Sequence, residues 1–185
     1  MKREVRLDRF DRSGLDRGRS KLIEAAWCIC KSVIFLSSLP YPNALKCGLL
    51  KLFGATIGQG LNIQPRVSIH FPWKLTIGDF CWIGQRCEIH NLEAIVLEDH
   101  VALAHDVFLT SGNHDYKSST MPYRNRPILI RRGSWIASRA FIGPGITVGE
   151  HSVVSAGSIV VRDVPDWSIV AGNPATVIRR RMLDR

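Results

Sequence analysis

Between residues 57 and 160 an aliphatic residue returns at every sixth position, in groups of three. The members are Ile57, Ile63 and Ile69; Ile77, Ile83 and Ile89; Leu97, Leu103 and Leu109; Ile130, Ile136 and Ile142; and Val148, Val154 and Val160. A period of six fits neither the 3.6-residue repeat of an α-helix nor the two-residue alternation of a lone strand. Short strands with a tight corner every six residues build a parallel β-helix. The pattern therefore predicts an all-β fold of about five coils.

The spacing of the groups reveals one long insertion. Early coils start twenty residues apart and the last two start eighteen apart, whereas the gap from Leu97 to Ile130 is thirty-three. About fifteen surplus residues therefore lie in a loop over residues 111–127. Long loops on a rigid scaffold tend to carry function, and this one contains His114.

The chain before the repeat divides into two parts. Residues 1–20 are polar and basic, and residues 21–52 are mainly apolar, with Pro40 and Pro42 between two predicted short helices. The apolar run 25–39 would span about 22 Å as a helix, which is shorter than the roughly 30 Å hydrocarbon layer of a bilayer. We expect this segment to cap the open end of the prism, or alternatively to lie on a membrane surface. The predicted divisions are 1–54, 55–163 for the repeat, and a tail of 164–185 whose residues 177–183 form a basic helical turn.

Composition narrows the possible classes of protein. The 185 residues are 45% hydrophobic, which suits one continuous core, and the net charge is +9. No nucleic-acid motif accompanies the basic clusters, so a solvated surface or an anionic small ligand explains them better. The five Cys show neither metal nor disulfide spacing, and no signal peptide opens the chain, so we expect a cytoplasmic protein.

The hexads, the loop with His114 and the ending AGNPA at residues 171–175 resemble the hexapeptide-repeat acetyltransferases, which fold as left-handed parallel β-helices. Within that family the sequences FGATIG, from residue 53, and SGNHDY, from residue 111, are most similar to the sugar O-acetyltransferase branch of colanic acid and other exopolysaccharide synthesis. The resemblance implies a homotrimer that binds acetyl-CoA between neighbouring subunits and accepts a sugar or oligosaccharide. It implies no metal ion.

The resemblance also makes His114 the catalytic base. Imidazole can take the proton of a sugar hydroxyl and return it to the leaving thiolate near neutral pH. Asp115 could orient the imidazole, bind the sugar or hold a turn, and Tyr116 could stack on the sugar or anchor the loop. No Ser or Cys lies in a nucleophile motif, which favours direct transfer from acetyl-CoA to the acceptor.

A donor for the tetrahedral oxyanion is expected on the coil before the loop. The resemblance points to Asn91, yet strict register puts His90 at the matching position, and a corner role for Asn91 is the alternative. His70 and His90 should stack about 4.8 Å apart on one edge. Two stacked histidines could begin a metal site like that of the γ-class carbonic anhydrases, but the third histidine of such a site is not identifiable.

The resemblance places the acetyl-CoA groove along the last coils. The matching residues are Trp135, Ser138, Ala156, Gly157, Arg162 and Arg179. A tryptophan could stack on the pantetheine arm or the adenine, and an arginine could pair with a phosphate, although packing and solvation explain the same residues. The sequence thus predicts an acetyl-CoA-dependent sugar O-acetyltransferase. An amino-sugar N-acetyltransferase, a γ-carbonic-anhydrase-like metalloenzyme and a non-catalytic scaffold are the alternatives.

Overall fold

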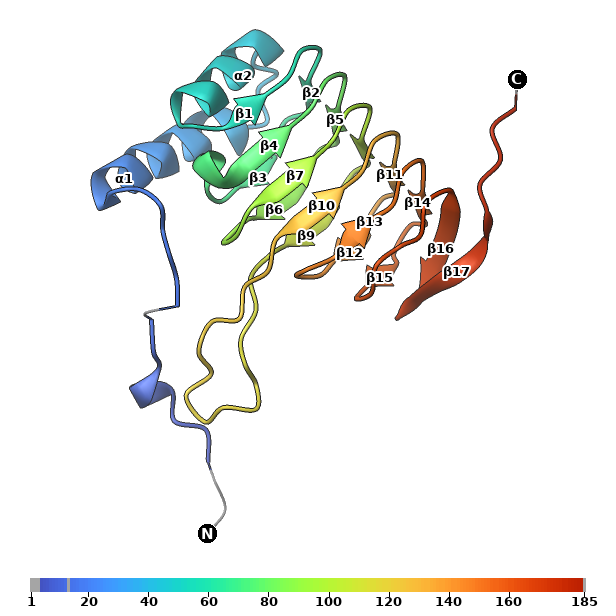
Figure 1. Ribbon diagram of the computed structural model, residues 1–185. Coiled ribbons are helices and arrows are strands. Elements are labelled where there is room, and N and C mark those ends of the chain that lie inside the picture. The colour runs from blue at the N-terminus through green and yellow to red at the C-terminus, as the bar shows by residue number, and fades with distance from the viewer. Residues whose placement is uncertain (1–3, 13, 185) are drawn as a thin grey trace.

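The protein is a parallel β-solenoid with a helical segment at its N-terminal end, described in a computed structural model over residues 4–12 and 14–184 (Figure 1). Each full coil contributes one short strand to each of three sheets, and the strands of successive coils pair in parallel. The first sheet contains β1 (Thr56–Ile57), β4 (Leu75–Ile77), β7 (Ile95–Leu97), β10 (Ile128–Ile130) and β13 (Thr147–Val148). The third contains β3 (Ser68–Ile69), β6 (Glu88–His90), β9 (Phe108–Thr110), β12 (Phe141–Ile142) and β15 (Ile159–Val160).

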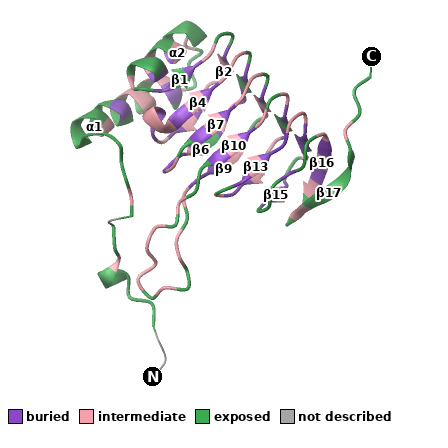
Figure 2. Cartoon of the chain, in the orientation of Figure 1, coloured by how far each residue is buried: buried purple, intermediate pink, exposed green. Residues whose placement is uncertain are grey.

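The second sheet has the most strands, and its last strand lies close to the C-terminal end of the chain. It contains β2 (Asn62–Ile63), β5 (Trp82–Ile83), β8 (Ala102–Leu103), β11 (Trp135–Ile136), β14 (Val153–Val154), β16 (Ser168–Gly172) and β17 (Ala175–Arg180). Equivalent hexad residues pair in register from coil to coil, as in Ile83 with Leu103. Their side chains fill the interior of the prism, and Figure 2 colours these buried residues purple. The six-residue period is therefore confirmed as the core of a parallel solenoid.

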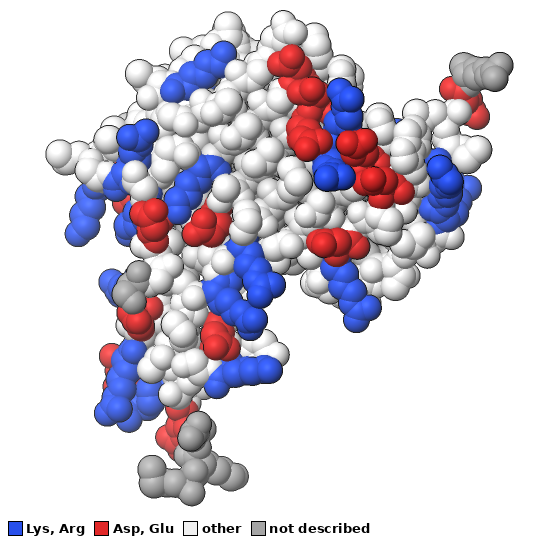
Figure 3. Space-filling model, viewed as in Figure 1, with Lys and Arg blue, Asp and Glu red and all other residues white. Residues whose placement is uncertain are grey.

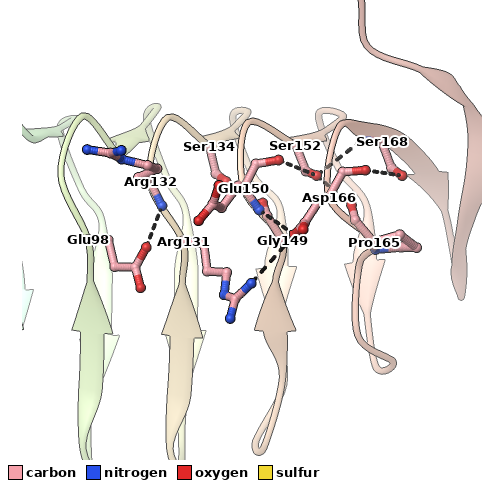
Figure 4. Close-up of polar contacts among 10 residues, drawn as sticks. All are labelled: Glu98, Arg131, Arg132, Ser134, Gly149, Glu150, Ser152, Pro165, Asp166 and Ser168. Carbon is pink, nitrogen blue, oxygen red and sulfur yellow. Dashed lines mark hydrogen bonds and ion pairs between the residues drawn. The ribbon is translucent and has the colours of Figure 1, made fainter.

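The corners bring neighbouring coils into close backbone contact. At Gly84, which directly follows the buried Ile83, an added Cβ would lie 2.6 Å from the carbonyl carbon of Ala104 in the next coil. Carboxylates link the coils at another corner, shown in Figure 4. There Asp166 accepts a hydrogen bond from the Glu150 N–H at 2.8 Å. Buried serines contribute as well, since Ser134 donates to the Gly149 carbonyl at 2.7 Å.

The solenoid continues past the expected boundary at residue 163. Val164 pairs with Val148, and β16 pairs in parallel with β14, so a sixth, partial coil follows the five predicted ones. The predicted helical turn over 177–183 is wrong, because residues 175–180 form β17 antiparallel to β16. A final parallel strand leaves an open sheet edge, and a returning strand satisfies its backbone better than a helical turn would.

Two short helices cover the other end, as the prolines predicted. They are α1 (Lys21–Cys30), continued by a π-helix (Lys31–Phe35), and α2 (Asn43–Leu52). The buried Lys46 ammonium donates to the Ile63 carbonyl at 2.8 Å, and the Trp27 indole donates to the Ile69 carbonyl at 3.0 Å. These contacts make the helices a cap on the first coil. In the described part of the chain, no helix combines the length and apolar character needed to cross a bilayer.

Candidate functional site

The long loop of residues 111–127 leaves the prism after β9 and returns at β10, projecting away from the coils (Figure 1). Its two arms pair with each other. The Arg126 N–H donates to the Ser111 carbonyl at 2.9 Å, and the Arg124 N–H donates to the Asn113 carbonyl at 2.8 Å. An antiparallel bridge joins His114 to Tyr123 further out. The loop is thus an ordered ribbon that holds His114 in a defined place.

Contacts within the loop fix the tautomer of His114. Its Nδ1 lies 2.8 Å from the carbonyl oxygen of Met121. Because a carbonyl can only accept, Nδ1 must carry the hydrogen, and a neutral ring then keeps the lone pair on Nε2. The ring stacks on Tyr123 with 5.0 Å between centroids and is half-buried. This arrangement presents one basic nitrogen with a fixed orientation.

The N-terminal arm, described over residues 4–12 and 14–20, contacts the same loop through its first part (Figure 1). Phe10 lies 5.6 Å from the His114 ring and 5.3 Å from Tyr123, between ring centroids. The Arg6 N–H donates to the Ser119 carbonyl at 2.7 Å. Sequence reasoning missed Phe10, because a single aromatic residue in a basic, non-periodic segment carries no pattern that would link it to a loop a hundred residues away.

The neighbours of His114 in sequence face different surroundings. Asp115 accepts a hydrogen bond from the Lys117 N–H at 3.1 Å, which is the geometry of a turn. Of the roles considered for Asp115, this contact matches that of holding a turn. Tyr116 is 75% exposed and has a free face for a ligand.

A column of polar side chains runs up one edge of the prism to the base of the loop. The rings of His70 and His90 are 5.0 Å apart between centroids, close to the expected stacking distance. His90 Nδ1 lies 3.1 Å from the Thr110 hydroxyl, which accepts a hydrogen bond from the Gly112 N–H at 3.2 Å. The column therefore connects the end of the first coil, at His70, to the loop that carries His114.

Asn91 points elsewhere. It is fully buried, and its amide donates to the Phe71 carbonyl at 2.6 Å and accepts from the Phe71 N–H at 2.9 Å. The nitrogen and the oxygen of the side-chain amide thus both bond to the backbone of the preceding coil. This is the role expected of an asparagine that holds a corner of the solenoid. His90, the residue that strict hexad register indicates, is half-buried and lies beside Thr110 at the base of the loop. A ligand could therefore reach His90, whereas it could not reach the buried Asn91.

The pKa of His70 is lowered to about 4, mainly by burial and in addition by the positive charges of His90, Lys31 and Arg17. Burial also lowers the pKa of His90. Both imidazoles are therefore neutral at pH 7, and a neutral ring both donates and accepts one hydrogen bond.

The lowered pKa of His70 predicts an acid-sensitive fold. The unfolded chain protonates this histidine near pH 6.5, whereas the folded protein does so only near pH 4. The free energy of unfolding should therefore fall as the pH drops from about 6.5 to 4, by up to about 3 kcal/mol from this residue. Urea unfolding at several pH values should show a shallower loss for His70→Gln than for the wild type. Equal slopes for the two proteins would contradict the expectation.

Four of the six residues predicted for the cofactor groove line two neighbouring hollows. Trp135 lines a hollow of about 380 Å³ together with Trp82, Ala102 and His105. A second hollow of about 520 Å³ brings together three of the predicted residues with His105 and Arg139; the three are Ser138, Ala156 and Gly157. Because His105 borders both, the hollows are adjacent along one corner of the prism.

The two predicted phosphate ligands lie outside these hollows. Arg162 follows β15 and Arg179 lies on β17, and both are exposed. Within residues 4–12 and 14–184, neither arginine forms a salt bridge. In the same part of the chain, no three His, Cys, Asp or Glu side chains are grouped so that they could hold a metal ion.

Comparisons with known proteins agree with this architecture, although no protein-family model matches the sequence. The chain is 36% identical over 166 residues to the colanic acid biosynthesis acetyltransferase WcaF of Escherichia coli strain K12, covering 90% of this chain and 91% of WcaF. The solved galactoside acetyltransferase in complex with coenzyme A superposes with a TM-score of 0.75 at 26% identity, covering 87% of this chain and 83% of that one. The acetyl-CoA complex of the Vibrio cholerae hexapeptide-repeat acetyltransferase VCA0836 shares the fold, with a TM-score of 0.79, 24% identity, and coverage of 88% and 89%.

Proposed function

Since the chain belongs to the hexapeptide-repeat acetyltransferase family, we propose that it transfers an acetyl group from acetyl-CoA to a sugar hydroxyl. The acceptor belongs to a cell-surface or secreted polysaccharide, because WcaF bears the name of such a pathway and galactoside acetyltransferase is named for a sugar. The five cysteines are free thiols, which is typical of the reducing cytoplasm. We place the reaction in that compartment.

His114 acts as the general base in this proposal. Its Nδ1–H is held by the Met121 carbonyl, so Nε2 takes the proton of the sugar hydroxyl as the oxygen attacks the thioester carbonyl. The C–O bond forms, the C–S bond breaks, and the same nitrogen returns the proton to the leaving thiolate. No covalent enzyme intermediate is required.

We assign the oxyanion donor to His90 in preference to Asn91. His90 is neutral at pH 7 because burial lowers its pKa, and a neutral ring retains one N–H to donate. Its Nδ1 lies 3.1 Å from the Thr110 hydroxyl, whose hydrogen can go either to Nδ1 or to the Gly112 carbonyl at 3.4 Å. In this proposal the hydroxyl donates to Nδ1, which leaves Nε2–H for the substrate. The buried amide of Asn91 already bonds to Phe71.

Acetyl-CoA binds, in this proposal, along the corner lined by Trp135, Ser138, Ala156 and Gly157. The small residues let a slender pantetheine arm approach the backbone, and the exposed Trp135 offers a flat apolar face. Arg162 and Arg179 are the candidate phosphate ligands at the end of the groove. The long loop projects away from its own prism, so we propose a homotrimer in which the His114 of one subunit serves a groove shared with its neighbour.

The fixed tautomer of His114 is the observation that carries this proposal. Its test is free-thiol release from acetyl-CoA in the presence of neutral sugars, amino sugars and buffer alone. Release that depends on a sugar hydroxyl supports O-acetylation, and release only with amino sugars would move the activity to N-acetylation. The absence of any sugar-dependent release would overturn the proposal.

Phe10 should influence the rate through its packing on His114. Phe10→Ala removes the ring that lies against His114 and Tyr123, so the loop loses part of its support and kcat should fall about tenfold. The KM for acetyl-CoA should stay the same, because the cofactor groove lies on other coils. Leu7→Ala is the matched control in the same arm, since Leu7 is 64% exposed. An equal loss of kcat in both variants would assign the effect to the arm as a whole.

A further inference from the structure

A preformed hollow of about 430 Å³ lies between α1 and the segment that follows β3 at the end of the first coil. Lys21, Glu24 and Lys31 line one side, spaced by three and seven residues so that they share a face of the helix. Arg17 of the arm, His70 and Trp73 line the other parts. The tryptophan indole donates to the Arg17 carbonyl at 2.7 Å, which fixes the arm against the coil.

The hollow carries a surplus of positive charge. Arg17 forms a salt bridge with Glu24 at 2.9 Å, so these two charges offset each other. Lys21 and Lys31 form no salt bridge with any residue that the structure describes. Figure 3 shows basic side chains over α1 and the arm, with acidic side chains among them. Two unpaired ammonium groups beside an apolar, aromatic wall favour a ligand with an anionic group and a less polar body.

The same hollow is connected to the proposed catalytic region. His70 lines it and contacts His90, which bonds to Thr110 at the base of the long loop. Lys31 is close enough to His70 and His90 to lower the pKa of both. A ligand whose anionic end lies near Lys31 would therefore extend along the histidine column toward the loop.

We propose that this hollow binds the phosphate or diphosphate group of a phosphate-linked acceptor sugar. The inference rests on the proposed function and adds the class of acceptor to it. The charge surplus matches a dianion. Lys21 and Lys31 are ten residues apart, about 15 Å along the helix, so both ammonium groups reach one diphosphate only when their flexible side chains converge over the hollow between them. The aromatic wall formed by Trp73 then packs against the group attached to the phosphate.

The kinetic test compares a neutral hexose with its 1-phosphate, a nucleoside diphosphate derivative and a polyprenyl diphosphate derivative in detergent. We expect the phosphate esters to have a kcat/KM at least tenfold above that of the neutral hexose. Lys31→Gln and Lys21→Gln should each reduce that preference about tenfold, and Lys51→Gln on α2 is the matched control. The ester with the highest kcat/KM identifies the source of the phosphate. An unchanged preference in both lysine variants would overturn the inference.

A binding measurement separates this inference from the acetyl transfer itself. The pKa of His70, followed by NMR titration of its imidazole, should rise when the hexose 1-phosphate binds, because the anion offsets the charges of Lys31 and Arg17. The rise should be lost in Lys31→Gln. A rise without any acetyl transfer would support the hollow and reject the proposed function. Sugar acetylation without either a phosphate preference or a rise would support the function and overturn the hollow.

Discussion

Replacement of His114 by alanine will lower sugar-dependent release of coenzyme A by about 10²–10⁴-fold, the usual contribution of a general base. The Met121 carbonyl fixes the hydrogen on Nδ1, so Nε2 is the only basic atom that this ring offers. Without it, the hydroxyl must attack while still protonated, and the thiolate must leave without a proton. The KM for acetyl-CoA should change little, because the proposed cofactor groove lies on other coils.

The control for this variant is His100→Asn. His100 stacks on Phe80 with ring centroids 5.4 Å apart, at a corner that contributes nothing to the proposed site. Its backbone φ is 58°, and asparagine tolerates that left-handed conformation better than alanine does. The rate of the His100→Asn variant should equal that of the wild type. Equal rates for His114→Ala and the wild type would remove His114 from the mechanism.

Replacement of Gly84 by alanine will lower the free energy of unfolding by about 2–4 kcal/mol. The three atoms nearest to the added Cβ belong to the backbone of the next coil, with two of them, Ala104 C and O, at 2.6 Å. A backbone cannot rotate away as a side chain can, so the two coils must separate and weaken the parallel pairing of β5 with β8. Urea unfolding measures the effect.

Two other glycines give graded controls for Gly84. At Gly143 the nearest atom, the Val160 carbonyl oxygen, lies 3.3 Å from an added Cβ, so Gly143→Ala should cost clearly less. At Gly48, within α2, no atom lies within 4 Å, and alanine should stabilise the helix by about 0.8 kcal/mol. If all three substitutions changed the free energy of unfolding equally, the close approach of the coils would not explain why glycine occupies position 84.

The repeat was predictable because it rests on local rules. Ile57, Ile63 and Ile69 and their successors must be buried, and a six-residue spacing leaves only a solenoid to bury them. The C-terminal strand was not predictable, because Val177 and Ile178 are exposed and carry no hexad signal. What makes them a strand is the unpaired edge of β16, a property of the assembled sheet and not of their own sequence.

The candidate site likewise has features that were predictable from the sequence and features that were not. The length of the loop and the place of His114 follow from counting along the chain. The direction of Asn91 does not, because a corner residue can turn inward or outward, and only its bonds to Phe71 decide between the two. Phe10 reaches His114 by tertiary packing alone. The hollow under α1 likewise needs the arm, the helix and the end of the first coil together.

The two ends of the solenoid also limit how these molecules associate. At the first coil, side chains of the cap occupy backbone groups that a strand would otherwise use: Lys46 takes the Ile63 carbonyl and Asn43 takes the Ile63 N–H. At the last coil, β17 runs antiparallel and covers the edge of β16. The second sheet therefore offers no parallel template to another copy at either end. A sequence whose coils are nearly interchangeable could in principle stack without limit into a fibre, and the covered ends of this sheet oppose such stacking.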